Sequence, residues 1–169
     1  IGCVRRRDRR EKRGLAATPR PIYRFMDLLR FIKMQGLGND FVVVDYRERA
    51  RAISEGQIRL IADRRRGVGC DQLIILERPK DPLADVFMRI YNADGGRVAA
   101  CGNATRCVAL LLMRQKNTRA VTIQTEAGLL PCRRTLDERI AVDMGRPRTR
   151  WQDIPLAHAT DPRNVTLSN

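Results

Sequence analysis

The sequence has few of the residues that commonly build metal centres and membrane segments. It contains one histidine, His158, and no Cys-x-x-Cys pair, whereas zinc sites use closely spaced cysteine and histidine ligands. No apolar run approaches the ~20 residues that span a bilayer, and aromatic residues make up only 5% of the chain. We therefore expect no metal site and no membrane partner.

The cysteines lack the pattern of a disulfide framework. There are five, an odd number, and their spacing is irregular. The N-terminal region has neither the apolar core nor the small-residue cleavage site of a secretory signal. Reduced thiols in a cytoplasmic protein are the interpretation that these features favour.

Basic residues outnumber acidic ones, and half of the excess lies near the N-terminus. The net charge is +14, and residues 1–30 hold ten Lys/Arg against three Asp/Glu. We expect a solvated, disordered basic leader. Docking of this leader on nucleic acid is the less favoured alternative, because no aromatic residues are interleaved in its strongest basic cluster, Arg5–Arg13. The chain begins at Ile1, and Met26 is a plausible start codon.

The apolar patterning predicts an α+β domain of about seven strands and two helices. Ser54 and Gln57 have the spacing of a capping box and predict a helix that continues to about Arg65. A second helix is expected from about Asn103 to Gln115. The predicted strands are Phe31–Met34, Phe41–Asp45, Leu73–Leu76, Val86–Tyr91, Val121–Thr125, Leu129–Arg134 and Ile140–Met144.

The second helical pattern begins directly after a cysteine, Cys101, and Asn103 is a candidate cap. A thiol at a helix N-terminus lies among unsatisfied N–H groups and the positive end of the helix dipole. Both favour the thiolate, which is the reactive form. A small buried hydrophobic side chain is the structural alternative for Cys101, since free cysteines are often buried.

Three predicted loops carry glycine together with side-chain amides. They contain Asn39, Gln72, and the pair Asn92 and Asn103. Asparagine and glycine also form ordinary turns, so the loops indicate a binding site only when taken together.

Four segments resemble the diaminopimelate epimerase family in sequence and order. They are Gly36–Phe41 (GLGNDF), Arg66–Leu73 (RGVGCDQL), Tyr91–Gly95 (YNADG) and Ala100–Cys107 (ACGNATRC). The resemblance covers residues 31–160 and implies a curved, mostly antiparallel sheet wrapped around a central helix. Residues 161–169 would then begin the connection to a second domain that this sequence does not contain.

The family resemblance also implies an activity and a set of site residues. Family members are isomerases that interconvert LL- and meso-diaminopimelate in lysine and peptidoglycan precursor biosynthesis, without a cofactor and commonly as homodimers. Cys101 would be one of two catalytic cysteines on opposite sides of the α-carbon. The substrate-binding residues would be Asn39, Gln72, Asn92, Gly102 and Asn103.

Several positions depart from the family pattern or stand outside the proposed chemistry. The partner cysteine of the family lies in a second domain, so we expect the 169 residues to be inactive alone. Cys70 and Cys107 are expected to serve packing, and Cys132 has no assigned role. A different cofactor-independent racemase or isomerase on the same fold remains an alternative, as does a basic nucleic-acid-binding module.

Overall fold

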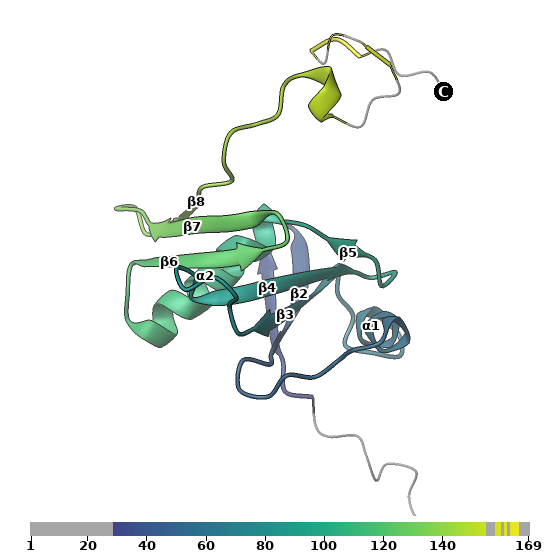
Figure 1. The fold of residues 1–169 in the computed structure, drawn as a ribbon. Coiled ribbons are helices and arrows are strands. Elements are labelled where there is room, and N and C mark those ends of the chain that lie inside the picture. The colour runs from purple at the N-terminus through teal and green to yellow at the C-terminus, as the bar shows by residue number, and fades with distance from the viewer. Residues whose placement is uncertain (1–28, 155–157, 160, 162, 166–169) are drawn as a thin grey trace, which may run out of the picture.

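The computed structural model describes residues 29–154, 158–159, 161 and 163–165 (Figure 1). The expected basic leader lies outside the described residues except for its last two positions, Leu29 and Arg30, as do parts of the expected connection after residue 160. The strands are β1 (Ile32–Gly36), β2 (Asn39–Asp45), β3 (Gln72–Glu77), β4 (Val86–Asn92), β5 (Arg97–Val98), β6 (Ala120–Thr125), β7 (Gly128–Arg134) and β8 (Ile140–Val142). The helices are α1 (Glu55–Ala62), α2 (Gly102–Lys116) and a 3₁₀ turn, Trp151–Asp153.

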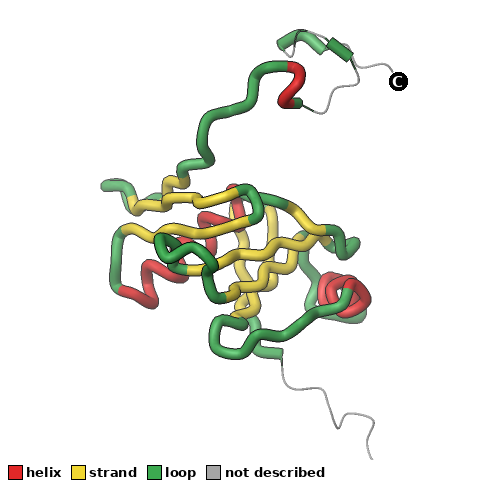
Figure 2. Tube along the Cα trace, in the orientation of Figure 1, coloured by secondary structure: helices red, strands yellow, loops and turns green. Residues whose placement is uncertain are grey.

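The strands form a single curled sheet in the order β1-β2-β3-β4-β6-β7-β8, with β5 paired to β4 (Figure 2). Two of the pairings, β2 with β3 and β4 with β6, are parallel. The chain makes these parallel pairings after crossing over through α1 and α2. All other pairings are antiparallel. The predicted α+β class and the mostly antiparallel curved sheet are therefore confirmed.

The sheet is covered on both faces by helices. Side chains of β2 alternate between two separate apolar clusters, Phe41 and Val43 on the side of α2, and Val42 and Val44 on the side of α1. Strands that are buried on both faces read as continuous apolar runs, which is why this segment lacks the polar alternation of a surface strand. The α2 helix packs against β1, β6, β7 and β8, and α1 packs against β3.

The start of α1 matches the sequence prediction, whereas its end does not. The side chain of Ser54 accepts a hydrogen bond from the backbone N–H of Gln57, and the Gln57 side chain accepts one from the backbone N–H of Ser54. The helix ends at Ala62 rather than near Arg65. The chain turns back there, and the loop packs so closely on the last turn that a Cβ added to Gly67 would meet the Leu60 carbonyl oxygen at 1.8 Å.

The start of α2 differs from the prediction in its capping residue. Cys101, with φ −146° and ψ 110°, is the N-cap, and its side chain makes no capping hydrogen bond. Asn103 lies inside the first turn, and its side chain bonds to neighbouring residues instead of the helix backbone. The prediction that Asn103 caps this helix was therefore wrong.

One strand was not predicted. The two-residue strand β5 pairs with the last part of β4, Ile90 with Val98 and Tyr91 with Arg97. Two residues are too few to establish a period of alternating polarity. This short strand nevertheless determines how the chain returns from the end of β4 to the start of α2.

Candidate active site

Three of the four predicted amide residues lie at the same end of the sheet. Phe41 on β2 pairs with Gln72, the first residue of β3, and Gln72 pairs across with Asn92, the last residue of β4. Asn39 lies two residues before Phe41, at the first position of β2. Strand register therefore brings together residues that are separated by up to 53 positions in the chain.

The start of α2 reaches this end of the sheet through a direct amide–amide bond. Asn103 donates a hydrogen bond from Nδ2 to Oδ1 of Asn39 at 2.6 Å. Arg106, one turn further along α2, donates to Oδ1 of Asn103. The β1–β2 turn and the helix N-terminus are thus connected by side chains that both belong to the predicted set.

The other two amides form a second pair. Gln72 donates from Nε2 to Oδ1 of Asn92 at 3.0 Å, between neighbouring strands. Both side chains are accessible to solvent. The five predicted binding residues therefore lie as two hydrogen-bonded pairs, with Gly102 beside one of them at the first position of α2.

Cys101 is half-buried and immediately precedes α2. Its carbonyl oxygen accepts hydrogen bonds from the backbone N–H of Thr105 at 2.9 Å and from the Thr105 hydroxyl at 2.7 Å. Since Thr105 is fully buried, these bonds fix the backbone that carries the thiol. The start of a helix presents unsatisfied N–H groups, which are donors for negatively charged groups bound beside it.

Gly102 leaves space at the helix start between Arg106 and Met144. A Cβ added to Gly102 would lie 3.7 Å from Arg106 Nη1 and 3.8 Å from Met144 Sδ, which is ordinary contact. A larger side chain would therefore fill the space between these groups.

The other described cysteines are buried. Burial raises the pKa of the Cys70 and Cys107 thiols above its ordinary value, and it raises the pKa of Cys132 to about 11. Cys70 belongs to the apolar cluster beneath α1, and Cys107 and Cys132 belong to the cluster beneath α2. The packing role predicted for Cys70 and Cys107 is confirmed. Cys3 lies outside the described residues.

A charged cluster next to the amides was not predicted from the sequence. Asp40 and Asp71 exchange backbone-to-side-chain hydrogen bonds of 2.9 Å in both directions. Arg64 bridges the two carboxylates, and Lys33 pairs with Asp40 at 2.8 Å. Hydrogen bonds from Arg64 above all, and from Lys33, hold the pKa of Asp40 well below its usual range.

The arginine run at residues 64–66 is exposed to solvent but takes part in ion pairs. It follows α1 rather than ending it, and Arg64 reaches two carboxylates of the charged cluster. The only feature of the sequence that could have indicated the charged cluster is that each of its aspartates directly neighbours a predicted binding amide. Arg66 is more exposed and pairs with Asp63.

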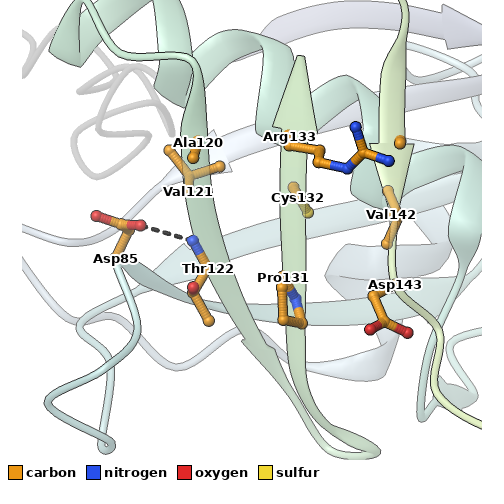
Figure 3. Close-up of a pocket in the computed structure, with 10 residues that line it drawn as sticks. Asp85, Ala120, Val121, Thr122, Pro131, Cys132, Arg133, Val142 and Asp143 are labelled. Atoms are coloured by element: carbon orange, nitrogen blue, oxygen red, sulfur yellow. Dashed lines mark hydrogen bonds between the residues drawn. The ribbon is translucent and has the colours of Figure 1, made fainter. Parts of the chain in front are cut away.

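A cavity of about 600 Å³ lies elsewhere, over β6, β7 and β8, and includes Asp85, Arg133 and Asp143 among its lining residues (Figure 3). None of the predicted site residues lines it. Asp85 is already engaged there, because it accepts a hydrogen bond from the backbone N–H of Thr122 at 2.7 Å and pairs with Lys116.

Two further properties concern the described residues only. They contain no group of three or more His, Cys, Asp or Glu side chains placed to hold a metal ion. Neither α-helix in this part of the chain has the length and apolar character needed to cross a membrane.

Solved structures share the fold at low sequence identity. A hydroxyproline epimerase from Agrobacterium vitis, crystallised with trans-4-hydroxy-L-proline, matches with a TM-score of 0.50 and 17% identity over 66% of this chain and 40% of its own. A probable proline racemase from Agrobacterium radiobacter K84 matches with a TM-score of 0.50 and 18% identity over the same shares. At this identity the likeness shows the fold alone.

Curated relatives are much more similar in sequence. A diaminopimelate epimerase of Rhodospirillum centenum is 52% identical over 136 residues, which are 80% of this chain and 47% of the relative. One of Acidiphilium cryptum is 51% identical over 82% of this chain and 49% of the relative. The chain thus spans about half the length of these relatives. The family profile named Diaminopimelate epimerase matches residues 31–150. The chain belongs to the diaminopimelate epimerase family.

Proposed function

We propose that this chain supplies one half of the active site of a diaminopimelate epimerase, with Cys101 as a catalytic acid/base. The observation that carries the proposal is the bond between Asn39 and Asn103. This hydrogen bond joins residues of two family motifs that are 64 positions apart in the chain. It lies at the start of α2, directly after Cys101. Relatives named diaminopimelate epimerase, about 50% identical over most of this chain, support the choice of substrate.

In the proposed reaction, the Cys101 thiolate removes the α-proton of the substrate. The C–H bond breaks, an S–H bond forms, and the electron pair left on carbon is delocalised into the neighbouring carboxylate. Preorganised N–H donors stabilise such developing charge without the cost of reorienting solvent. The first turn of α2 supplies these donors beside Cys101. A second thiol returns a proton on the opposite face, so the proposed reaction uses no cofactor.

The second thiol is not one of the other described cysteines in this proposal. Cys70, Cys107 and Cys132 are buried in apolar clusters, and burial disfavours their thiolates. We therefore place the partner cysteine in the part of the relatives that this chain does not match. On this basis, the described residues alone do not complete the inversion.

The two amide pairs are proposed to bind the polar ends of the substrate. Asn39 and Asn103 lie at the helix start and would contact the groups next to the α-carbon, together with Gly102. Gln72 and Asn92 have accessible amides at the ends of β3 and β4 and would hold a more distant amino or carboxylate group. We propose that the complete enzyme acts on this small molecule in the cytoplasm as a homodimer.

The experiment joins the 136 residues of this chain that match the Rhodospirillum centenum relative to the unmatched remainder of that relative. Epimerisation is measured by exchange of the α-proton of LL-diaminopimelate in deuterated water and by formation of the meso form. We expect turnover of diaminopimelate and none of L-proline or trans-4-hydroxy-L-proline. Preferential turnover of the cyclic amino acids would instead assign the site to another racemase of this fold.

A further inference from the structure

The charged cluster beside the amide pairs ties together two loops that each carry a predicted binding residue. The backbone N–H of Asp40 donates to Oδ2 of Asp71, and the N–H of Asp71 donates to Oδ1 of Asp40, both at 2.9 Å. The N–H of Asp71 also lies 3.0 Å from the Asp40 carbonyl oxygen. Each aspartate thus holds the backbone of the other.

Two carboxylates can be this close because cations neutralise them. Arg64 donates from Nη1 and Nη2 to the two carboxylate oxygens of Asp40, at 2.9 and 2.7 Å, and from Nη2 to Asp71 at 2.8 Å. Lys33 on β1 adds a contact of 2.8 Å to Asp40. The planar guanidinium can serve both carboxylates at once, which a single ammonium group does less well.

Arg64 is itself held in place by the loop after α1. Gly69 has a φ of +77°, and a Cβ there would lie 3.0 Å from the Arg64 Cα and Cγ atoms. The N–H groups of Gly69 and Cys70 bond back to carbonyl oxygens of Ile61 and Ala62 at the end of α1. The loop is therefore fixed on a helix that packs against the sheet.

Both aspartates directly adjoin residues of the proposed site. Asp40 follows Asn39, and Asp71 precedes Gln72. The Asn39 side-chain amide lies between the Asp71 carboxylate and the Asn103 side-chain amide. Its Nδ2 lies 3.5 Å from Asp71 Oδ2, and its Oδ1 accepts a hydrogen bond from Asn103. An acceptor-only carboxylate on the NH₂ side and a donor on the oxygen side permit one orientation of this amide.

We propose that Asp71, held by Arg64 and Asp40, is a positioning residue that fixes the orientation of Asn39 and its spacing from Gln72. The predicted effect on substrate binding rests on the proposed function. The claim that Asp71 fixes the orientation of Asn39 rests on the observed contacts alone. The cluster also stabilises the fold through Asp40, but the positioning role of Asp71 is separate, because Asp71 contacts the Asn39 amide and the Asp40 backbone.

The test compares Asp71→Ala with Asp63→Ala in the full 169-residue chain. Asp63 is a matched control, because it also accepts backbone N–H bonds, from Arg65 and Arg66, in the same loop. The side-chain hydrogen bonds of Asp63 go to those two residues and do not reach the amide pairs. A second matched pair is Arg64→Gln against Arg66→Gln, since Arg66 bonds to Asp63 instead.

Two readouts are recorded. The first is the ¹H–¹⁵N signals of the Asn39 and Gln72 side-chain amides in this chain, and the second is the affinity for LL-diaminopimelate, by titration of the joined protein described under Proposed function with the same substitutions. We expect Asp71→Ala and Arg64→Gln to move both amide signals and to weaken binding about tenfold. Core methyl signals should stay in place in these variants. The two control variants should leave the amide signals and the affinity unchanged, whatever their effect on thermal stability.

Unchanged amide signals in Asp71→Ala, or equal changes in Asp63→Ala, would overturn the positioning role. An unaltered joined protein that does not bind diaminopimelate would contradict the proposed function. The amide signals would still decide the geometric claim in that case, because they are measured without substrate.

Discussion

At the scale of single residues, Cys101 differs from the other described cysteines in its surroundings. It is half-buried at a helix start, whereas Cys70, Cys107 and Cys132 lie within apolar clusters. Thiolates are the nucleophilic form, and accessible thiols near helix N-termini form them more readily than buried ones. Sulfur chemistry in the described part of the chain is therefore expected to concentrate at one position.

Alkylation with iodoacetamide at neutral pH tests this difference. We expect Cys101 to react at least about tenfold faster than the three buried cysteines, as measured by mass spectrometry of peptides over time. The same experiment in denaturant is the control, since all thiols are then exposed and their rates should converge. Equal rates for Cys101 and Cys132 in the folded protein would contradict the assignment.

At the scale of elements, the α1 helix and the loop after it carry the charged cluster to the amides. The helix begins with a local signal, the Ser54–Gln57 capping box, and ends through a close approach of backbone at Gly67. The end of the helix is set by contacts between its last turn and the loop that follows. This is why the sequence located the start of this helix better than its end.

Two glycine substitutions distinguish the effect of the close backbone approach from that of helix propensity. Gly67→Ala should lower the free energy of unfolding by more than about 2 kcal/mol, because the added Cβ would overlap the Leu60 carbonyl oxygen and force the loop to move. Gly56 lies inside α1 with open space around it, so Gly56→Ala should raise the free energy of unfolding by up to about 1 kcal/mol. Urea unfolding measures both. Equal effects would show that the close approach does not constrain the loop.

The charged cluster also makes a prediction about pH. Its cations hold the pKa of Asp40 far below the unfolded value of about 3.9, so the ionised carboxylate stabilises the fold above pH ~4. This contribution is lost as pH falls towards the folded pKa. The difference in unfolding free energy between the unaltered chain and Asp40→Asn should therefore be largest near pH 7. It should shrink below pH ~4 in urea titrations, and a difference independent of pH would contradict this account.

The parts of the fold and site that the sequence predicted are those with local signals. The apolar run of β2 and the helical spacing of α2 were sufficient to predict these elements. The Asp40–Asp71 exchange joins residues 31 positions apart, and no local pattern marks it. The capping prediction for Asn103 failed because a competing tertiary partner, Asn39, engages that side chain.

At the scale of the whole molecule, the matched region covers about half of each relative named above. Within it, strand register and α2 bring the predicted amides to one end of the sheet, next to one accessible thiol. Inversion at a carbon needs a proton donor on the face opposite the base. We therefore place the complete reaction in an assembly of this region with the remainder of such a relative.

The most direct measurement is α-proton exchange and epimerisation of LL-diaminopimelate by the joined protein described above, with and without Cys101→Ala. We predict turnover by the parent and a loss of at least about 100-fold in the variant. Thermal unfolding should change little, because the Cys101 side chain makes no capping bond and is only half-buried at the edge of the α2 cluster, so the substitution removes one partly exposed sulfur. A Cys101→Ala protein that epimerises within tenfold of its parent would contradict the central claim.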